Sequence, residues 1–188
     1  MKHVNIILAS QSPRRKQLLE QIGIIPDCRP VYIDETKQES ETHLQYCMRM
    51  AYEKALAGWK QSDETKAILG SDTIVVCNDQ TLGKPSDEAD AFNMLKMLSN
   101  NVHQVITTVC LKSKAGQKTV VSISDVEFSE INNNEIRDYI SSKEPMDKAG
   151  SYAIQGFAAQ WIKSISGSYS GIMGLPLYET SKLIREHA

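Results

Sequence analysis

The sequence predicts an α/β protein whose sheet contains both parallel and antiparallel strands. Short apolar runs typical of strands alternate along the chain with segments in which apolar residues recur at helical spacing. Two strand-like runs near the middle, Val102–Leu111 and Thr119–Phe128, flank a polar turn at Lys114–Gln117 and are typical of a meander. With 188 residues, 41% of them hydrophobic and 23% charged, the chain fits one domain or two lobes of one fold.

The first predicted unit is a strand, a loop and a helix. Asn5–Ala9 is a short apolar run and predicts a buried strand. Ser12 is a suitable N-cap, and a proline follows it at the first helical position, where its missing N–H costs nothing. We therefore expect a helix over about Pro13–Ile22, ended by Gly23.

The remaining elements follow from the same periodicities. The long second helix, predicted over Glu41–Lys60, would place Tyr46, Met50 and Ala57 on its inner face. The predicted strands are Cys28–Ile33, Ala67–Cys77 and Gln160–Ile165, with a turn at Asn78–Gln80 after the second of them. The predicted helices are Glu41–Lys60, a helix capped by Ser86 and running through Leu98, Asn132–Ser142 and Leu175–His187.

Charge and cysteine content exclude several classes of protein. The formal net charge is −2, so there is no overall positive field to hold a nucleic acid, and any anion site must be built locally. The apolar run Val4–Ala9 is interrupted by Asn5 and soon followed by basic residues, which fits neither a signal sequence nor a membrane span. The four cysteines are too widely spaced for a CxxC pair and too few for a disulfide scaffold. We therefore expect a cytoplasmic protein with reduced thiols and with neither a nucleic acid nor a membrane partner.

The turn between the first strand and the first helix is a candidate anion site. It carries Ser10, Ser12, Arg14 and Arg15 at a predicted helix N-terminus. Unpaired N–H groups, the positive end of the helix dipole and arginine forks all match phosphate oxygens. The alternative is an ordinary capped helix with solvated arginines, although arginines there oppose the dipole.

Asp72 stands inside an apolar run that otherwise favours burial. A lone buried carboxylate is costly, so this group is expected to be paired, metal-bound or at a cleft. Glu35, just beyond another predicted strand, would supply a second carboxylate for a divalent metal. The alternatives are that Asp72 begins its strand and caps a turn with Thr73, and that Glu35 belongs to a solvated turn.

Several scattered polar residues complete the candidates. Lys54, Lys84 and Lys148 could neutralise a polyphosphate together, although each taken singly fits a surface lysine equally well. The Gly-Lys-Pro sequence around Lys84 lacks the frame of a P-loop. Gln155 has the donor and acceptor needed to read the edge of a base, and a plain buried turn would look the same. His103, between two predicted strands, fits a structural hydrogen bond.

Together these residues resemble successive signatures of the Maf family of nucleoside triphosphate pyrophosphatases. The matching segments, in chain order over nearly the whole sequence, are Leu8–Arg15, Glu53–Ala55, Gly70–Val76, Gly83–Pro85, His103–Thr107, Asp147–Gly150, Ile154–Gly156 and Gly174–Leu177. The resemblance implies one elongated domain over residues 1–188, with a mixed sheet and two lobes around a deep cleft, similar to the inosine-triphosphate pyrophosphatases.

The resemblance also implies an activity. Family members hydrolyse a nucleoside triphosphate to the monophosphate and pyrophosphate with Mg²⁺ or a similar ion such as Mn²⁺ or Co²⁺. Arg14, Thr73 and Gln155 match the residues that mark the subgroup acting on dTTP and UTP. Ser71, where alanine is usual, is one of a few small departures that put fine substrate preference in doubt.

The roles implied by the resemblance divide into two groups. Asp72 would activate the attacking water, and Glu35 would help it to hold the metal. The residues expected to bind the nucleotide are Ser10, Ser12, Arg14, Arg15, Lys54, Thr73, Lys84, Lys148 and Gln155, of which Thr73 and Gln155 would contact the pyrimidine.

Other functional readings stay open at this point. A nucleotide-binding regulator of septum formation needs the same pocket, with hydrolysis incidental, but it has no use for a water-activating carboxylate. A house-cleaning enzyme with purine preference is a further alternative, as is action on modified pyrimidine nucleotides. The resemblance is also compatible with a homodimer.

Overall fold

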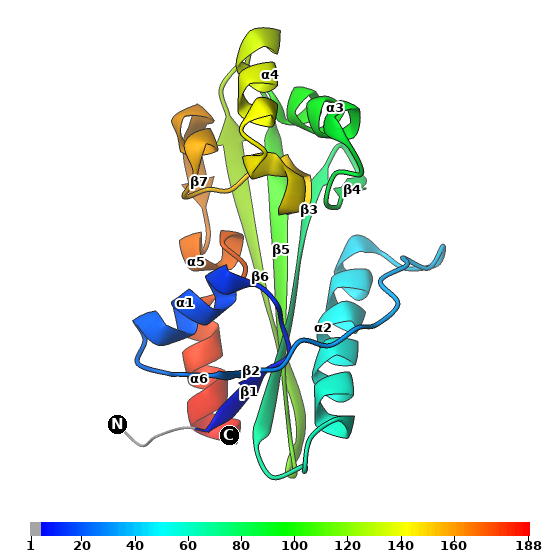
Figure 1. Cartoon of the computed structure of the whole chain (residues 1–188), viewed down its shortest axis with the longest axis vertical. Helices are drawn as coiled ribbons and strands as arrows, with labels where there is room; N and C mark the ends of the chain where they lie inside the picture. The colour runs from blue at the N-terminus through cyan, green and yellow to red at the C-terminus, as the bar shows by residue number, and fades with distance from the viewer. Residues whose placement is uncertain (1–4) are drawn as a thin grey trace. The chain divides into compact units, whose positions relative to one another are not determined.

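The structure, a computed structural model, describes residues 5–188 (Figure 1). Within this range, seven strands form one mixed sheet in the order β2-β1-β3-β5-β6-β7, with β4 paired to β3. Strand β1 is parallel to both β2 and β3, whereas β4 is antiparallel to β3 and β7 is antiparallel to β6. The predicted mixed α/β fold class is therefore confirmed.

The bounds of the elements are as follows. The strands are β1 (Ile6–Leu8), β2 (Asp27–Cys28), β3 (Ala67–Cys77), β4 (Gln80–Leu82), β5 (Val102–Ser113), β6 (Gly116–Phe128) and β7 (Ile162–Ser166). The α-helices are α1 (Pro13–Gln21), α2 (His43–Lys60), α3 (Glu88–Leu98), α4 (Asn133–Ser141), α5 (Tyr169–Ile172) and α6 (Leu177–His187). The 3₁₀ helices are η1 (Glu144–Asp147), η2 (Ala149–Ser151) and η3 (Phe157–Trp161). No helix of the described residues is long and apolar enough to cross a membrane.

Elements with strong local signals lie where they are predicted. Strand β3 has the predicted bounds. Ser12 caps α1 by accepting from the N–H of Arg15, and Gly23 follows the helix with a φ of 79°. Helix α4 begins after an Asn132 cap and forms a capping box with Glu135, which satisfies N–H groups that the helix leaves unpaired.

Several predicted boundaries are wrong, since β6 begins at Gly116 and not at Thr119, and α6 begins at Leu177 and not at Leu175. The strand expected at Cys28–Ile33 pairs only as far as Cys28, and Pro30 has no N–H to continue the ladder. The cap of α3 is Asp87, whose carboxylate accepts from the N–H of Asp90, rather than Ser86. The last strand begins at Ile162 instead of Gln160, because η3 extends through the two preceding residues. Strand β4 and helix α5 were not predicted.

The chain divides into two compact units. Unit 1 comprises the residues up to Asp72, Thr107–Ser122 and Gly174–Ala188. Unit 2 comprises Thr73–Ile106 and Ile123–Met173. Each unit has its own buried core.

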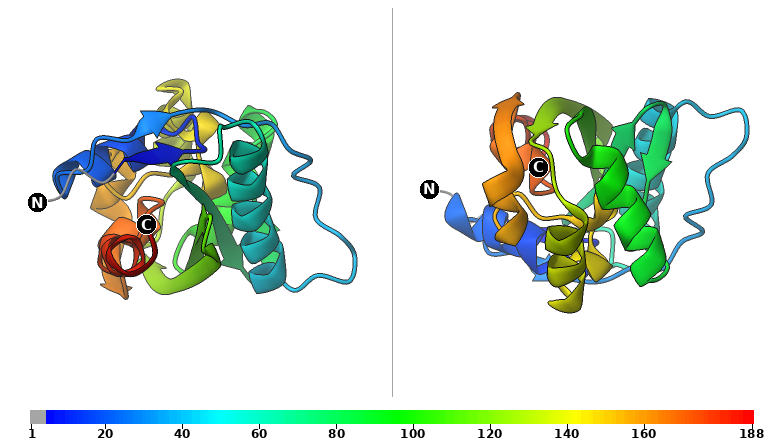
Figure 2. Two further views of the ribbon diagram at one scale, coloured as in Figure 1. Left: turned by 90° about the horizontal axis from the view of Figure 1, so that it is seen from below. Right: turned by 90° about the horizontal axis from the view of Figure 1, so that it is seen from above.

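In unit 1, helix α2 packs closely on β3 because glycines, which have no side chain, lie where the two backbones meet. A Cβ at Gly58 would lie 2.8 Å from Cγ2 of Ile68, and a Cβ at Gly70 would overlap the carbonyl oxygen of Ala51. Figure 2 shows α2 and α6 on opposite sides of β3. The close approach of α2 to β3 brings the polar residues of the two elements into direct contact.

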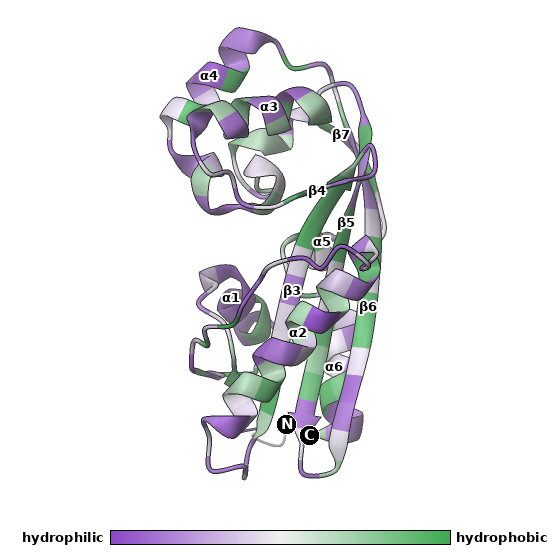
Figure 3. Ribbon diagram, turned by 90° about the vertical axis from the view of Figure 1, so that its right-hand side faces the viewer, coloured by the Kyte–Doolittle hydropathy of each residue, from purple (hydrophilic) through white to green (hydrophobic). Residues whose placement is uncertain are grey.

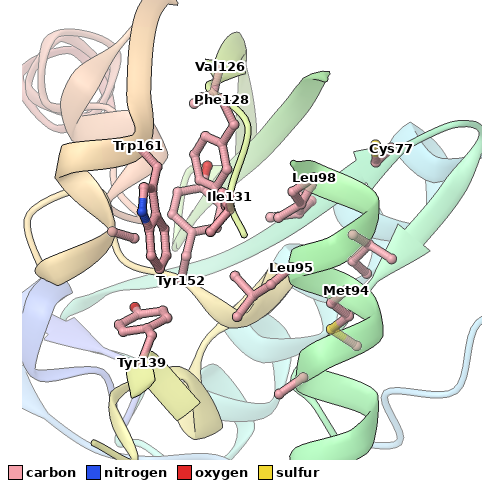
Figure 4. Packing of buried hydrophobic residues seen from close by; sticks show 14 of the residues in the cluster. Cys77, Met94, Leu95, Leu98, Val126, Phe128, Ile131, Tyr139, Tyr152 and Trp161 are labelled. Atoms are coloured by element: carbon pink, nitrogen blue, oxygen red, sulfur yellow. The ribbon is translucent and has the colours of Figure 1, made fainter. Parts of the chain in front are cut away.

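In unit 2, a cluster of aromatic rings forms the centre of the core (Figure 4). The rings of Phe128 and Tyr152 meet edge to face at 4.9 Å, and those of Tyr139 and Trp161 at 5.2 Å. Helix α4 contributes its apolar face to this core, whereas most of its surface is hydrophilic (Figure 3). The apolar positions of helix α4 therefore face the core, as its amphipathic sequence predicts.

His103 is part of this core, as predicted for a structural histidine. It is 1% exposed, and its Nε2 lies 2.7 Å from the hydroxyl of Tyr152. Burial lowers the pKa of His103 to about 4. The native state therefore holds the imidazole neutral at pH values where an exposed histidine would already bind a proton.

We predict that replacing Gly70 by alanine destabilises the protein by about 1–3 kcal/mol, because the new methyl group would overpack the contact between α2 and β3. The obstructing atoms belong to the backbone of α2, with the amide nitrogen of Ala55 only 2.5 Å away, so no side chain can rotate to relieve the clash. Urea unfolding measures the effect. Gly83→Ala is the matched control, since a Cβ there meets nothing within 4 Å. Equal stability of the two variants would contradict the packing described.

We also predict that acid destabilises the protein through His103. The folded-state pKa is about 4 against an ordinary value of 6.5, so the contribution is complete above pH 6.5 and is lost as the pH falls toward 4. Between pH 6.5 and about pH 5 the free energy of unfolding should fall by about 2 kcal/mol from this group. In His103→Gln this part of the pH dependence should vanish, and parallel pH profiles of the two proteins would refute the assignment.

Candidate functional site

The turn between β1 and α1 is shaped by its own hydroxyl groups. Oγ of Ser10 accepts the N–H of Ser12 at 3.1 Å, and Oγ of Ser12 accepts the N–H of Arg15 at 3.5 Å. Both serines therefore organise the first turn of the helix directly. The N-terminus of α1 remains next to two arginines, Arg14 and Arg15, as the sequence predicts.

Arg15 is held by one group that is distant in the chain and by one that is near. Its Nε donates to the carbonyl oxygen of Gly174 at 2.9 Å, and one terminal nitrogen donates to Oγ of Ser10 at 3.3 Å. Desolvation by burial lowers the pKa of Arg15, while the negative charges of Asp72 and Glu35 act in the opposite direction. The alternative of a freely solvated arginine is therefore wrong for Arg15, which lies within the electrostatic reach of both candidate carboxylates.

Lys54 joins those two carboxylates. Its ammonium nitrogen lies 2.7 Å from Oδ1 of Asp72 and 2.8 Å from Oε1 of Glu35. The side chains of Lys54 and Asp72 are 12% and 11% exposed, whereas that of Glu35 is 59% exposed. Asp72 is thus a buried, paired carboxylate in the middle of β3, and the alternative that it begins the strand and caps a turn is wrong.

The packing of α2 on β3 explains this pairing. Residues i and i+2 of a strand share a face, so Gly70 lies on the same side of β3 as Asp72. The absence of a side chain at Gly70 lets the backbone of Ala51 and Ala55 approach, and Lys54 is in the same helical turn. The helix is therefore close enough for the lysine to reach the carboxylate.

Cys47 also contacts Asp72, but through the backbone. Its thiol donates to the carbonyl oxygen of Asp72 at 3.5 Å. Burial raises the pKa of Cys47 to about 12, with the Asp72 charge a smaller cause. The thiol stays protonated and is not a nucleophile. None of the four cysteines forms a disulfide within the described residues.

Two of the candidate lysines belong to unit 2 and lie on neighbouring segments. The N–H of Gly150 donates to the carbonyl oxygen of Gly83 at 3.0 Å, which places the segment of Lys148 against that of Lys84. Lys84 is exposed. The ammonium of Lys148 contacts Oδ1 of Asp147 at 2.6 Å, and the side chain of Lys148 is only 12% exposed. Lys148 is therefore a held cation and not a freely solvated surface lysine.

The turn that carries Gln155 depends on Glu144, which the sequence analysis did not identify. Oε1 of Glu144 accepts the N–H of Phe157 at 3.2 Å and the hydroxyl of Tyr139 at 3.0 Å. A Cβ at Gly156 would overlap the same oxygen, so a larger residue there would require the side chain of Glu144 to move. Gln155 itself is exposed. Gly156 was the only signal in the sequence that another group approaches this turn closely, and nothing in the sequence identified that group as Glu144.

The candidates thus fall into two sets. Thr73 follows Asp72 in β3, and consecutive side chains of a regular strand leave on opposite faces. Unit 1 contains Ser10, Ser12, Arg14, Arg15, Glu35, Lys54 and Asp72, and unit 2 contains Thr73, Lys84, Lys148 and Gln155. In chemical terms, the unit 1 set combines two carboxylates with several cations, an arrangement suited to binding a phosphate chain together with a divalent metal.

Comparison with known proteins places the chain among a group of named enzymes. A protein named dTTP/UTP pyrophosphatase from Vibrio vulnificus (strain YJ016) is 46% identical over 181 residues, which cover 96% of this chain and 97% of the relative. Proteins of the same name from Vibrio parahaemolyticus serotype O3:K6 and Pseudoalteromonas atlantica are 44% and 46% identical, over 98% and 95% of this chain and the same shares of the relatives.

The profile of one protein family, described as Maf-like protein, matches residues 5–187. This range includes every candidate residue discussed above, in both units. Together with the full-length relatives, it confirms the resemblance found in the sequence. The chain belongs to the Maf-like protein family.

Proposed function

We propose that this protein is a nucleoside triphosphate pyrophosphatase that hydrolyses dTTP and UTP to the monophosphate and pyrophosphate. The observation that carries the proposal is the identity of 46% over 96% of the chain with a relative named dTTP/UTP pyrophosphatase. Identity over nearly the whole length makes it reasonable to treat residues 1–188 as one functional domain, although the chain divides into two compact units. The proposed role in the cell is the cleansing of nucleotide pools.

The carboxylates of unit 1 fit a divalent metal. Oxygens of Asp72 and Glu35 lie within 2.8 Å of one nitrogen, so a single cation already bridges them. Mg²⁺ is usually bound by one or two carboxylates together with substrate phosphates and water. The described residues contain no group of three or more His, Cys, Asp or Glu side chains that could hold a metal ion. Asp72 and Glu35 would hold Mg²⁺, Mn²⁺ or Co²⁺, which would neutralise phosphate charge and polarise the reacting phosphoryl group.

In the proposed mechanism, Asp72 accepts a proton from the attacking water. The water oxygen bonds to the α-phosphorus, and the bond from the α-phosphorus to the bridging oxygen breaks, so the electron pair leaves with pyrophosphate. Lys54 and Arg15 face the same carboxylates and would counter the negative charge that develops on the leaving group. Asp72 is mostly buried, and electrostatic interactions are stronger where water is excluded.

The remaining roles stay predictions that the family resemblance supports. Ser10, Ser12 and Arg14 would bind phosphate oxygens at the first turn of α1, where helix N–H groups and a cation meet. Lys84 and Lys148 would bind phosphates, and Thr73 and Gln155 would contact the pyrimidine. The cytoplasmic location and the homodimer are likewise predictions.

We predict that the purified protein releases pyrophosphate, and no orthophosphate, from dTTP and UTP faster than from purine nucleoside triphosphates. Asp72→Asn keeps the size of the side chain but removes the base, so turnover should fall by about 10²–10⁴-fold. Pyrophosphate and orthophosphate are measured separately over a panel of nucleotides that includes modified pyrimidines. Wild-type turnover in Asp72→Asn would defeat the assignment of the base, and a preference for purine nucleotides would defeat the substrate assignment.

We further predict that Lys54→Met binds Mg²⁺ more tightly than the wild type in the absence of nucleotide. The ammonium of Lys54 occupies the position between the two carboxylates, so its removal leaves them free for another cation. Added Mg²⁺ should raise the melting temperature of Lys54→Met more than that of the wild type, because ligand binding to the native state stabilises it. Lys66→Met is the control, since Lys66 pairs with Asp27 and not with these carboxylates. Equal Mg²⁺ shifts in all three proteins would exclude Asp72 and Glu35 as the metal ligands.

A further inference from the structure

The segment that carries Glu35 has no regular secondary structure of its own. It lies between the end of β2 at Cys28 and the start of α2 at His43. The side chain of Glu35 is 59% exposed, so burial does not determine its position. A flexible carboxylate would contribute weakly to a site in which distances must be maintained. Other contacts must therefore hold this residue beside Lys54.

Two side chains of α2 bind the backbone of this segment at adjacent residues. The hydroxyl of Tyr46 donates to the carbonyl oxygen of Glu35 at 2.8 Å. One terminal nitrogen of Arg49 donates to the carbonyl oxygen of Thr36 at 2.9 Å. Tyr46 and Arg49 are three positions apart and so share one face of the helix. The backbone on the C-terminal side of Glu35 is thus held by two successive hydrogen bonds from one helix.

Arg49 is itself anchored and is not free to follow the loop. Its guanidinium donates to both carboxylate oxygens of Glu41, one of them at 2.8 Å, and to Glu53 at 3.3 Å. Glu41 also accepts the N–H of Gln38 at 2.9 Å, which ties it to the same loop. The side chains of Arg49 and Glu41 are 19% and 11% exposed. Such a two-pronged arginine–carboxylate contact fixes geometry better than a single ion pair does.

A local hydrogen bond to the residue before Glu35 also orders this segment. Oδ1 of Asp34 accepts the N–H of Thr36 at 2.9 Å, which closes a turn around Glu35. Burial raises the pKa of Tyr46 to about 12, so its hydroxyl keeps its proton at neutral pH and can donate. Helix α2 therefore supplies both the cation that pairs with Glu35, Lys54, and the groups that hold the backbone of Glu35.

We propose that Tyr46 and Arg49 are positioning residues that hold Glu35 at the metal and phosphate site. The inference rests on the proposed function, because it takes the role of Glu35 from that function. Neither residue is assigned a contact with the substrate. Each acts by fixing a backbone carbonyl next to a carboxylate that would otherwise sample many positions. Loss of either contact should therefore weaken the use of the metal and slow the chemical step, with little effect on nucleotide binding.

The test compares Tyr46→Phe and Arg49→Lys with the wild-type protein. The first substitution removes one hydroxyl, and the second keeps the charge but loses the fork that spans Glu41 and Thr36. In each variant kcat should fall by about three- to tenfold, as expected for a lost hydrogen bond of ordinary strength. The Mg²⁺ concentration for half-maximal rate should rise, while KM for dTTP stays within about twofold. Matched controls are Tyr178→Phe, exposed on α6, and Arg29→Lys, where the arginine makes two hydrogen bonds to Asp27 away from Glu35.

A double-mutant cycle with Glu35→Gln separates positioning from general stabilisation. If Tyr46 and Arg49 act through Glu35, their substitution in the Glu35→Gln background should change kcat by less than about twofold. Effects that multiply in full in that background, or melting temperatures that fall in parallel with kcat, would overturn the inference and leave the proposed function intact. Absence of pyrophosphate release by the wild type would overturn the proposed function and the inference together.

Discussion

The carboxylate of Asp72 lies inside a buried strand, and its charge must be matched there. A charged group in an apolar environment is costly unless it is paired and hydrogen-bonded. In this protein the opposite charge comes from Lys54, whose ammonium nitrogen lies 2.7 Å from Oδ1 of Asp72. The guanidinium of Arg15 also interacts electrostatically with this carboxylate. Much of the structure of unit 1 serves this requirement. Gly70 removes the side chain that would keep α2 away from β3, and α2 in turn presents the lysine.

The same arrangement that stabilises Asp72 is suited to phosphate chemistry. The ammonium group of Lys54 bridges two carboxylates in a compact site. A divalent cation bound there could replace the contacts of the ammonium with the carboxylates, and the ammonium could then contact the phosphate chain. Glu35 is exposed and Asp72 is buried, so burial helps to fix the position of Asp72 but not that of Glu35. This difference explains why contacts from α2 to the backbone of the Glu35 segment matter, whereas Asp72 is fixed by the strand itself.

In unit 2, too, a carboxylate holds the chain around a candidate residue. The turn before Gln155 is shaped by Glu144, whose carboxylate accepts from a backbone N–H and a tyrosine hydroxyl. A glycine lies beside it, and a methyl group at that position would displace the carboxylate. Both units therefore have glycine where another group approaches the backbone closely, and both hold an exposed candidate residue by anchoring the chain around it.

Local signals in the sequence determined the fold class, β3, and the beginnings of α1 and α4, because periodicity and capping act over a few residues. They also singled out Asp72, since a carboxylate in an apolar run needs a partner wherever it folds. Tertiary structure alone decided that the partner is Lys54 and that Glu35 joins it, because these residues are brought together only by the packing of α2 on β3. The end of β2 follows from Pro30, a local feature of the sequence. The start of β7, in contrast, also depended on tertiary contacts, since its pairing partner β6 is distant in the chain. For the same reason the supports of the candidate residues, Tyr46, Arg49 and Glu144, could be recognised only once distant segments had been placed side by side.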